Sequence, residues 1–401
     1  MIWEDSGRAP LELFFETDAN GAADLAPEPE AFLTACILPA MRARERRVRI
    51  EGAVCPRLAA GVTQAVGVLR RFHGPPRGPV TIEPAHGWRA IPPRRPERSA
   101  FFFTGGVDSC DLFGRNRLAH PSGHPAAFTD GLSTFGHLCP TDARTLRWND
   151  ASGAVLASIA VRQGFALTRV RTNVWELAPD VGFLAEESLA SALASSAHAF
   201  RSRWSAITIA SSRDTARERL RGTGPLIDPL YSSEALEVRY DLNPATRLER
   251  LQAIAVSPRG LLEDLIVCLA FPTPPDVNCG ECEKCVRTMT SLLAIGALDR
   301  ARRFPHRDVV PERVRAVTIG EHDADYWRDL LPLLAERGRA DLVDAIRVKL
   351  EESRVFVRWS ADTGWKGSLR KLDRRYLGGR LLRMRRRLSA RGAPSGPLSG
   401  A

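Results

Sequence analysis

One short stretch places the tightest limit on how this chain can fold. The apolar run Ala100 to Phe103 leads directly into a loop with two adjacent glycines, and Cys110 to Leu118 can continue as a helix. The loop residues are Thr104, Gly105, Gly106, Val107, Asp108 and Ser109. An apolar run that ends in adjacent glycines predicts a buried strand, a tight turn and a helix. We therefore expect a strand, loop and helix at the start of an α/β region.

The middle of the chain alternates short apolar runs with longer helical patterns. The strand-like runs are Ala100 to Phe103, Leu132 to Phe135, Ala166 to Val170 and Ala206 to Ala210. The main helical patterns between them are Ala151 to Gly164 and Glu186 to Arg203. Such alternation predicts an α/β fold with a parallel sheet and helices on both faces. Ligands of such sheets bind beyond the carboxyl ends of the strands.

The composition of the loop suits a phosphate group. Glycines remove the Cβ atoms that would keep backbone N–H groups away from an anion, and the start of a helix adds the positive end of its dipole. Thr104 and Ser109 supply hydroxyls, while Asp108 is placed to hold Mg²⁺ or to orient the loop. The alternative is a tight turn without a ligand. The spacing excludes the Gly-x-x-x-x-Gly-Lys loop of kinases and the Gly-x-Gly-x-x-Gly loop of dinucleotide-binding proteins.

Four of the eight cysteines have a spacing typical of a metal site. Three lie within seven residues, and the fourth lies eleven residues before them; they are Cys268, Cys279, Cys282 and Cys285. Four thiolates complete a tetrahedral shell around Zn²⁺ and leave no position for a catalytic water, so a structural zinc is expected. An iron–sulfur cluster and unligated thiols are the alternatives.

Together, these two motifs resemble a known family. Thr104 to Ser109 resembles the Ser-Gly-Gly-x-Asp-Ser signature of the PP-loop ATP pyrophosphatases. Cys268 and the Cys-Gly-x-Cys-x-x-Cys run from Cys279 to Cys285 resemble the zinc site of the 7-cyano-7-deazaguanine synthases within that superfamily. The resemblance covers Ala100 to Leu298, about half of the chain. It implies a Rossmann-like core of the HUP type, ATP binding by the loop, and Asp108 and Ser109 as catalytic residues.

Three further residues are candidates for contacts with a substrate. Arg213 follows the run Ala206 to Ala210, so it is expected at the ligand-bearing edge of the sheet. Asp228 and Glu234 lie where the resembled family places a loop on the substrate side. For each of these residues a role in a turn or a helix cap explains the composition equally well.

Composition changes along the chain suggest four segments. These are an accessory α+β domain at residues 1–98, the core with the zinc site at 99–300, a helical region at 301–365 and a basic tail at 366–401. From Lys366 to Arg391 eleven Lys and Arg residues meet one acid, which accounts for the whole net charge of +10. The tail is thus a candidate contact for nucleic acid or another acidic partner, with a solvated tail as the alternative.

The combined prediction is an enzyme that uses ATP and Mg²⁺ and carries a structural Zn²⁺. It would adenylate a carboxylate or carbonyl oxygen of a small molecule and let ammonia or another nucleophile displace AMP. The alternatives are an RNA-modifying enzyme that acts on a base, and a nucleotide-binding partner without catalysis. The sequence has no apolar stretch long enough for a bilayer and no signal-like start, so a cytoplasmic location is expected. Whether the protein forms a homo-oligomer stays open.

Overall fold

The computed structural model describes residues 1–19, 21–75, 77–90, 98–257, 260–320 and 322–360. The chain divides into two compact units, Met1–Val309 and Val310–Ala401. The first unit contains the sheets and the predicted site, and the second contains helices. The predicted basic tail at 366–391 lies outside the described residues.

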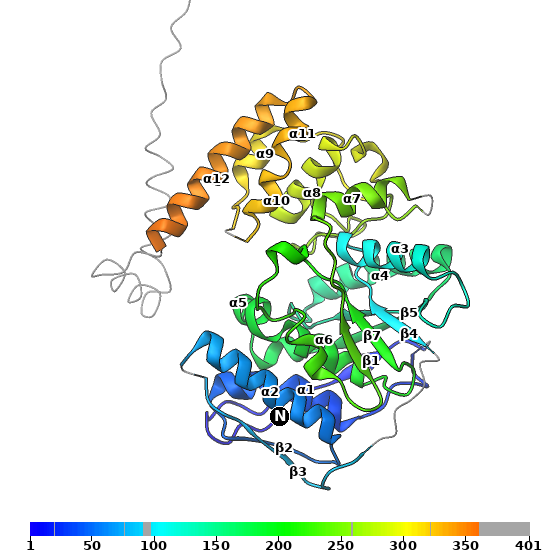
Figure 1. The fold of residues 1–401 in the computed structure, drawn as a ribbon, viewed down its shortest axis with the longest axis vertical. Helices are drawn as coiled ribbons and strands as arrows, with labels where there is room; N and C mark the ends of the chain where they lie inside the picture. Colours follow the sequence, from blue (N-terminus) through cyan, green and yellow to red (C-terminus); the bar gives the residue numbers. More distant parts are fainter. Residues whose placement is uncertain (20, 76, 91–97, 258–259, 321, 361–401) are drawn as a thin grey trace, which may run out of the picture. The chain divides into compact units, whose positions relative to one another are not determined.

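A six-stranded sheet forms the centre of the first unit (Figure 1). Its strands lie in the order β1, β6, β5, β4, β7, β8. Their bounds are β1 Phe15–Thr17, β4 Ser99–Phe102, β5 Phe128–Phe135, β6 Ala166–Thr172, β7 Ala206–Ile209 and β8 Glu237–Tyr240. All neighbouring strands are parallel except β1, which pairs with β6 in the antiparallel direction. The predicted α/β class with a largely parallel sheet is confirmed.

The chain winds from the centre of this sheet in both directions. From β4 it passes to β5 and β6 on one side, and then returns to place β7 and β8 on the other side. The loops after β4 and β7 therefore leave the same edge next to each other, in opposite winding directions. This reversal is where open α/β sheets form a crevice for a ligand.

The central strand β4 is buried on both faces, which explains its apolar sequence. Ala100 and Phe102 belong to the core shared with α1 (Pro29–Ala43), α2 (Pro56–His73) and α6 (Leu189–His198). The intervening side chain of Phe101 stacks on Phe113 of α3 (Val107–Ala119), with ring centroids 5.4 Å apart, and contacts Phe165, which follows α4 (Ala143–Gln163). Figure 1 shows α3 and α4 on one side of the sheet and α1, α2 and α6 on the other.

The helical pattern predicted at Ala151 to Gly164 corresponds to α4, which begins earlier, at Ala143. The pattern predicted at Glu186 to Arg203 is divided between the π-helix η2 and the helix α6. The longer helices are α1 Pro29–Ala43, α2 Pro56–His73, α3 Val107–Ala119, α4 Ala143–Gln163, α6 Leu189–His198, α7 Arg247–Val256 and α8 Glu283–Ala294. The shorter elements are η1 Val174–Leu177, α5 Val181–Phe183, η2 Leu184–Ser188, η3 Thr215–Arg217, η4 Asp228–Tyr231 and η5 Leu298–Arg300. A second sheet pairs β2 (Arg47–Ile50) with β3 (Thr81–Pro84) in parallel.

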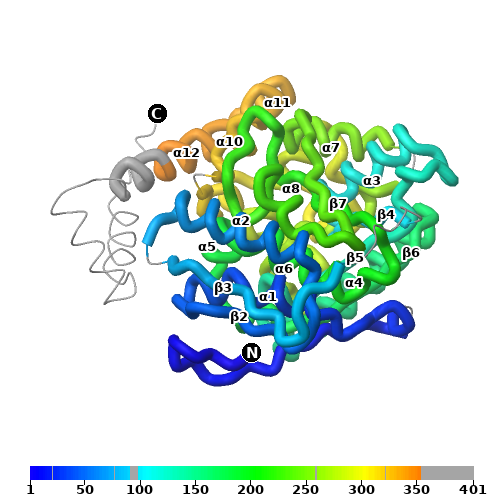
Figure 2. Tube along the Cα trace, turned by 60° about the horizontal axis from the view of Figure 1, so that its bottom comes forward, coloured from blue at the N-terminus to red at the C-terminus, as the bar shows by residue number. Residues whose placement is uncertain are grey.

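The first 90 residues share a core with the central sheet. β1 forms the edge of that sheet, and α1 packs on α6. Figures 1 and 2 show the blue N-terminal helices beside the green α6. The boundary predicted between residues 98 and 99 falls inside the compact unit Met1–Val309, in which α1 and α6 share one core.

Three short helices and one long helix make up the described part of the second unit. They are α9 Pro311–Ala316, α10 Ala324–Arg328, α11 Leu331–Glu336 and α12 Ala340–Ser360. The three short helices contact α12, and Trp327, Leu334, Leu342 and Ile346 are among the buried residues of this unit. No helix in the described ranges combines the length and the apolar character needed to cross a membrane.

Candidate functional site

The two glycines form the turn between β4 and α3, as the sequence predicts. Gly105 adopts a φ of +69°, and Gly106 is the N-cap of α3. The positive φ favours glycine, and a Cβ added at Gly105 would lie 2.7 Å from the Leu156 side chain, whose end would have to shift.

Hydroxyl groups at the two ends of the loop face each other. The Thr104 and Ser109 hydroxyl oxygens lie 3.3 Å apart. The Gly106 N–H donates to the Thr104 hydroxyl at 3.2 Å, and the Ser109 hydroxyl donates to the Gly106 carbonyl at 3.2 Å. The loop thereby keeps its shape through its own side chains, while the start of a 13-residue helix presents N–H groups at its mouth.

Asp108, in the first turn of α3, forms ion pairs with two arginines of α7. Arg247 Nη1 donates to both carboxylate oxygens at 3.0 and 2.8 Å, and Arg250 Nη1 donates to Oδ1 at 3.2 Å. Both oxygens of Asp108 are thus bound by guanidinium groups. This arrangement differs from the Mg²⁺ contact that the sequence suggested for Asp108, because two cations already lie against the carboxylate.

Arg250 joins the loops that leave the sheet after β4 and β7. Its side chain is 1% exposed and also donates to the carbonyl and hydroxyl of Ser211 and to the Arg213 carbonyl, the last at 2.8 Å. A buried guanidinium needs such a full set of acceptors to offset its desolvation. Arg250 therefore positions the loops at the point where the winding of the sheet reverses.

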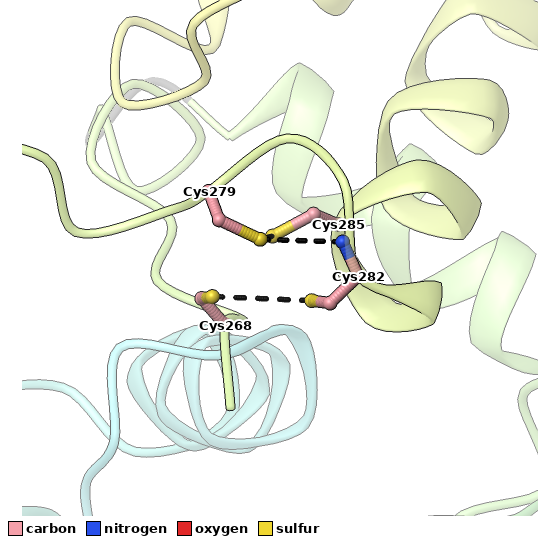
Figure 3. Close-up of side chains that lie close together, drawn as sticks. All are labelled: Cys268, Cys279, Cys282 and Cys285. Carbon is pink, nitrogen blue, oxygen red and sulfur yellow. Dashed lines mark hydrogen bonds between the residues drawn. The ribbon is translucent and has the colours of Figure 1, made fainter. Parts of the chain in front are cut away.

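The four cysteines lie together as the sequence predicts (Figure 3). All four Sγ atoms lie within 4.8 Å of one another, and the pairs Cys268–Cys282 and Cys279–Cys285 are each 3.9 Å apart. Four sulfurs at 2.3 Å from one tetrahedral zinc are about 3.8 Å apart. The spacing fits a single ion, whereas an iron–sulfur cluster needs its own irons and sulfides between the thiolates.

Backbone N–H groups support the sulfur atoms. Cys282 N donates to the Cys279 sulfur at 3.2 Å, and Ala270 N donates to the Cys268 sulfur at 3.3 Å. Hydrogen bonds from the Cys268 and Cys285 thiols lower the pKa of Cys282. Gly280 turns the chain with a φ of +73°, where a Cβ would meet Pro305 at 2.7 Å. These contacts are the usual support of a thiolate metal site.

Asn278 fixes the segment that carries Cys268 to the turn that carries Cys279. It is buried, its Oδ1 accepts from Val267 N at 2.9 Å, and its Nδ2 donates to the Leu265 carbonyl at 2.8 Å. Between these two partners, Ile266 N donates to the Gly105 carbonyl at 2.9 Å. The cysteine site and the glycine loop, far apart in the sequence, are therefore connected through one short segment.

Lys284, in the first turn of α8, is a further cation that interacts electrostatically with Arg247 and Asp108. Surrounding protein atoms desolvate its ammonium even though part of the side chain reaches solvent, and the guanidinium groups of Arg247 and Arg287 add to the effect, so its pKa is lowered. The Asp108 and Glu283 carboxylates oppose that shift. Lys284 is thus close enough to Asp108 and Arg247 to share one electrostatic environment with them.

The three predicted substrate contacts lie in different surroundings. Arg213 is buried, and its carbonyl binds Arg250 in the loop after β7. Asp228 is buried in η4 and accepts from the Thr223 hydroxyl and the Gly224 N–H, each at 2.8 Å. Glu234 N donates to the Cys55 sulfur at 3.5 Å, beside the start of α2. The contacts of Asp228 and Glu234 do not reach the glycine loop, and their role in substrate binding stays a prediction.

Sequence analysis did not find Arg247 and Arg250. Their partner Asp108 lies 139 and 142 residues away, so no local pattern pairs them. The available signal was a capping box, Thr246 with Glu249 three residues later, which begins α7 and places both arginines in its first turns.

Comparisons of the chain with protein-family models, with curated proteins and with solved structures find no match. The function of this chain therefore has to be inferred from the arrangement of the site itself.

Proposed function

We propose that this protein is an ATP-dependent adenylating enzyme of the PP-loop pyrophosphatase class, with a Rossmann-like core of the HUP type. It would cleave ATP between the α and β phosphates, transfer AMP to a carboxylate or carbonyl oxygen, and release pyrophosphate. Ammonia or another nucleophile would then displace AMP. The observation that carries the proposal is the Gly105-Gly106 turn at the reversal point of the sheet, onto which Arg247 and Arg250 converge.

The residues of the site suit charge neutralisation better than proton transfer. Loop N–H groups, the helix dipole and the α7 arginines would stabilise the charge that develops on the leaving pyrophosphate. Ser109, held against Thr104, would donate to a phosphate oxygen. Because both Asp108 oxygens are paired with guanidinium groups, Mg²⁺ would be held mainly by the nucleotide phosphates.

A zinc ion at the four cysteines would have a structural role in this enzyme. A Cys₄ shell has no open position, so zinc would supply rigidity and no Lewis-acid chemistry. The hydrogen bond from Ile266 N to the Gly105 carbonyl would connect this rigid site to the glycine loop and stabilise the loop.

The alternative of an RNA-thiolating enzyme is less well supported. A sulfur relay requires a reactive thiol outside the four-cysteine site, and Cys110 and Cys139 are the cysteines that follow β4 and β5. Both are buried, and burial raises the pKa of Cys139 to about 12 and also raises the pKa of Cys110. Buried thiols with raised pKa values are poor nucleophiles.

The deciding experiment is to identify the nucleotide product. The protein is incubated with ATP, Mg²⁺, ammonia and a panel of carboxylates, and AMP, ADP and pyrophosphate are separated by chromatography. AMP and pyrophosphate in equal amounts support the proposal, and ADP contradicts it. ATP binding without AMP formation across the panel would favour the non-catalytic alternative.

A further inference from the structure

Two arginines of α7 share one carboxylate beside the glycine loop. Arg247 and Arg250 both pair with Asp108, so this group keeps one net positive charge, which an anion would balance. Lys284 and Arg287 come from α8, where Arg287 is paired with Glu283.

The four cations are not equivalent. Arg250 is buried and donates to loop carbonyls, and Arg287 is bound to Glu283 at 2.7 Å with its side chain 4% exposed. In contrast, the Arg247 side chain is 13% exposed and lies at the first position of its helix, and Lys284 is exposed. Arg247 and Lys284 are therefore the two cations that can reach a bound molecule.

We propose that Arg247 and Lys284 bind the pyrophosphate part of the nucleotide together with the loop amides, and that Asp108 is the positioning residue for Arg247. This inference rests on the proposed function, because it assigns residues to the same nucleotide site. Asp108 is fixed in the first turn of α3, and its two bonds from Arg247 hold that guanidinium beside the start of the helix. A guanidinium in this place offers paired donors to phosphate oxygens, and an ammonium adds a point charge.

A second explanation of the same charges has to be tested alongside. A zinc ion with four thiolates carries two negative charges, and Lys284 lies between the ligands Cys282 and Cys285. On that explanation Lys284 offsets the charge of the zinc site, and its loss would weaken zinc binding without changing anion affinity.

The test measures the affinity of the full-length, zinc-loaded protein for inorganic pyrophosphate by calorimetry. Arg247→Ala and Lys284→Ala should each lower the affinity about tenfold or more, because each removes a charge-assisted hydrogen bond to the anion. The matched controls are Arg239→Ala, from an exposed ion pair on β8, and Lys349→Ala, from an ion pair in α12. These should change the affinity by less than about twofold.

Arg247→Lys separates geometry from charge. It keeps the cation but loses the paired donors, so it should fall between the wild type and Arg247→Ala. This variant also guards against the possibility that Arg247→Ala unfolds, which thermal unfolding of each variant will show.

A double-mutant cycle tests the positioning role of Asp108. If Asp108 acts through Arg247, Asp108→Asn changes pyrophosphate affinity in the wild type but has no further effect in the Arg247→Ala background. Equal effects of Asp108→Asn in the two backgrounds would overturn that role.

The outcomes distinguish this inference from the proposed function. A wild type that binds neither ATP nor pyrophosphate removes the proposed function itself. A wild type that binds both, with Arg247→Ala and Lys284→Ala unchanged, overturns the inference alone. Lost zinc with unchanged pyrophosphate affinity in Lys284→Ala also overturns it and assigns that lysine to the thiolates.

Discussion

Two aspartates of the first unit, Asp108 at the glycine loop and Asp228 between β7 and β8, have opposite surroundings. At the glycine loop, Asp108 meets two guanidinium groups and stays partly exposed. Residues 210–236 form the crossover segment between β7 and β8. In this segment Asp228 is buried against a hydroxyl and a backbone N–H, and desolvation raises its pKa to about 8. The first region holds a partly exposed carboxylate between two arginines, whereas the second buries a carboxyl group whose pKa is raised. The role of an aspartate thus depends on the groups that surround its side chain. Its position next to a predicted strand does not determine that role.

The strongest test of this difference is the loss of one of the four cysteines that we propose to bind zinc. Cys285→Ser should lose zinc, because the binding free energy of a structural zinc is about 10 kcal/mol or more and depends on all four ligands. Hydrogen exchange should then speed up at Thr104 to Ser109, through the Ile266 contact, and stay unchanged at Asp228 to Glu234. Metal analysis and exchange mass spectrometry check both effects.

Cys139→Ser is the matched control, since Cys139 is a buried cysteine outside the cluster. It should keep its zinc. Equal exchange rates at the loop in Cys285→Ser and the wild type would mean that the cysteine site does not support the loop.

The next largest effect concerns the pH dependence of stability. Asp228 has a folded pKa near 8 against an ordinary value of 3.8, so the folded state holds more protons than the unfolded state between these values. The free energy of unfolding should therefore fall as the pH rises from about 4 to 8, by up to about 1.4 kcal/mol per pH unit. Asp228→Asn should flatten this dependence, as measured by urea unfolding at several pH values.

Glu234→Gln makes the same charge change at a partly exposed position of the same segment. It should leave the slope as in the wild type. If Asp228→Asn does not alter the slope of the free energy of unfolding against pH, the buried carboxyl group is not the cause of that pH dependence.

Gly105→Ala should have a smaller effect on stability but a direct one on the site. The positive φ and the approach to Leu156 predict a loss of about 1–3 kcal/mol together with weaker ATP binding. Gly114→Ala, in the middle of α3 with open space around it, should be neutral or stabilise by about 0.5–1 kcal/mol. Unfolding and ATP titrations of the two variants give the comparison, and equal ATP affinity in both would argue against the loop as the nucleotide site.

The smallest effect is expected at Glu234. Glu234→Ala should change stability by less than about 0.5 kcal/mol and leave the kcat and KM of any acceptor substrate unchanged. A raised KM in Glu234→Ala would mean that the crossover segment contacts the substrate. The glycine loop and the crossover segment would then both belong to the site.

Sequence analysis predicted the central strands and both motifs because their signals are local. β4 is apolar on both faces, and the glycine turn and the cysteine spacing are each complete within a few residues. In contrast, β8 was missed because its sequence, Glu-Val-Arg-Tyr, alternates with charged residues and buries only Val238 fully. The place of β1 in the central sheet was missed because antiparallel pairing with β6 depends on contacts about 155 residues away.

The environment of each candidate residue was harder to predict than its position. Nothing near Asp108 in the sequence indicates two arginines, and nothing near Asp228 indicates full burial. Both facts depend on long-range packing, of α7 against α3 and of η4 against α2 and α6.

The hydrogen bond from Ile266 to Gly105 has a consequence for the newly made chain. During synthesis the strands up to β8 emerge before residue 266, so the sheet can begin to form while the glycine loop still lacks its later partners. Arg247, Arg250 and the four cysteines all follow β8 in the chain. A nascent chain that stops on the ribosome before this point would carry the complete sheet, but its glycine loop would still lack the contacts from Ile266, Arg247 and Arg250.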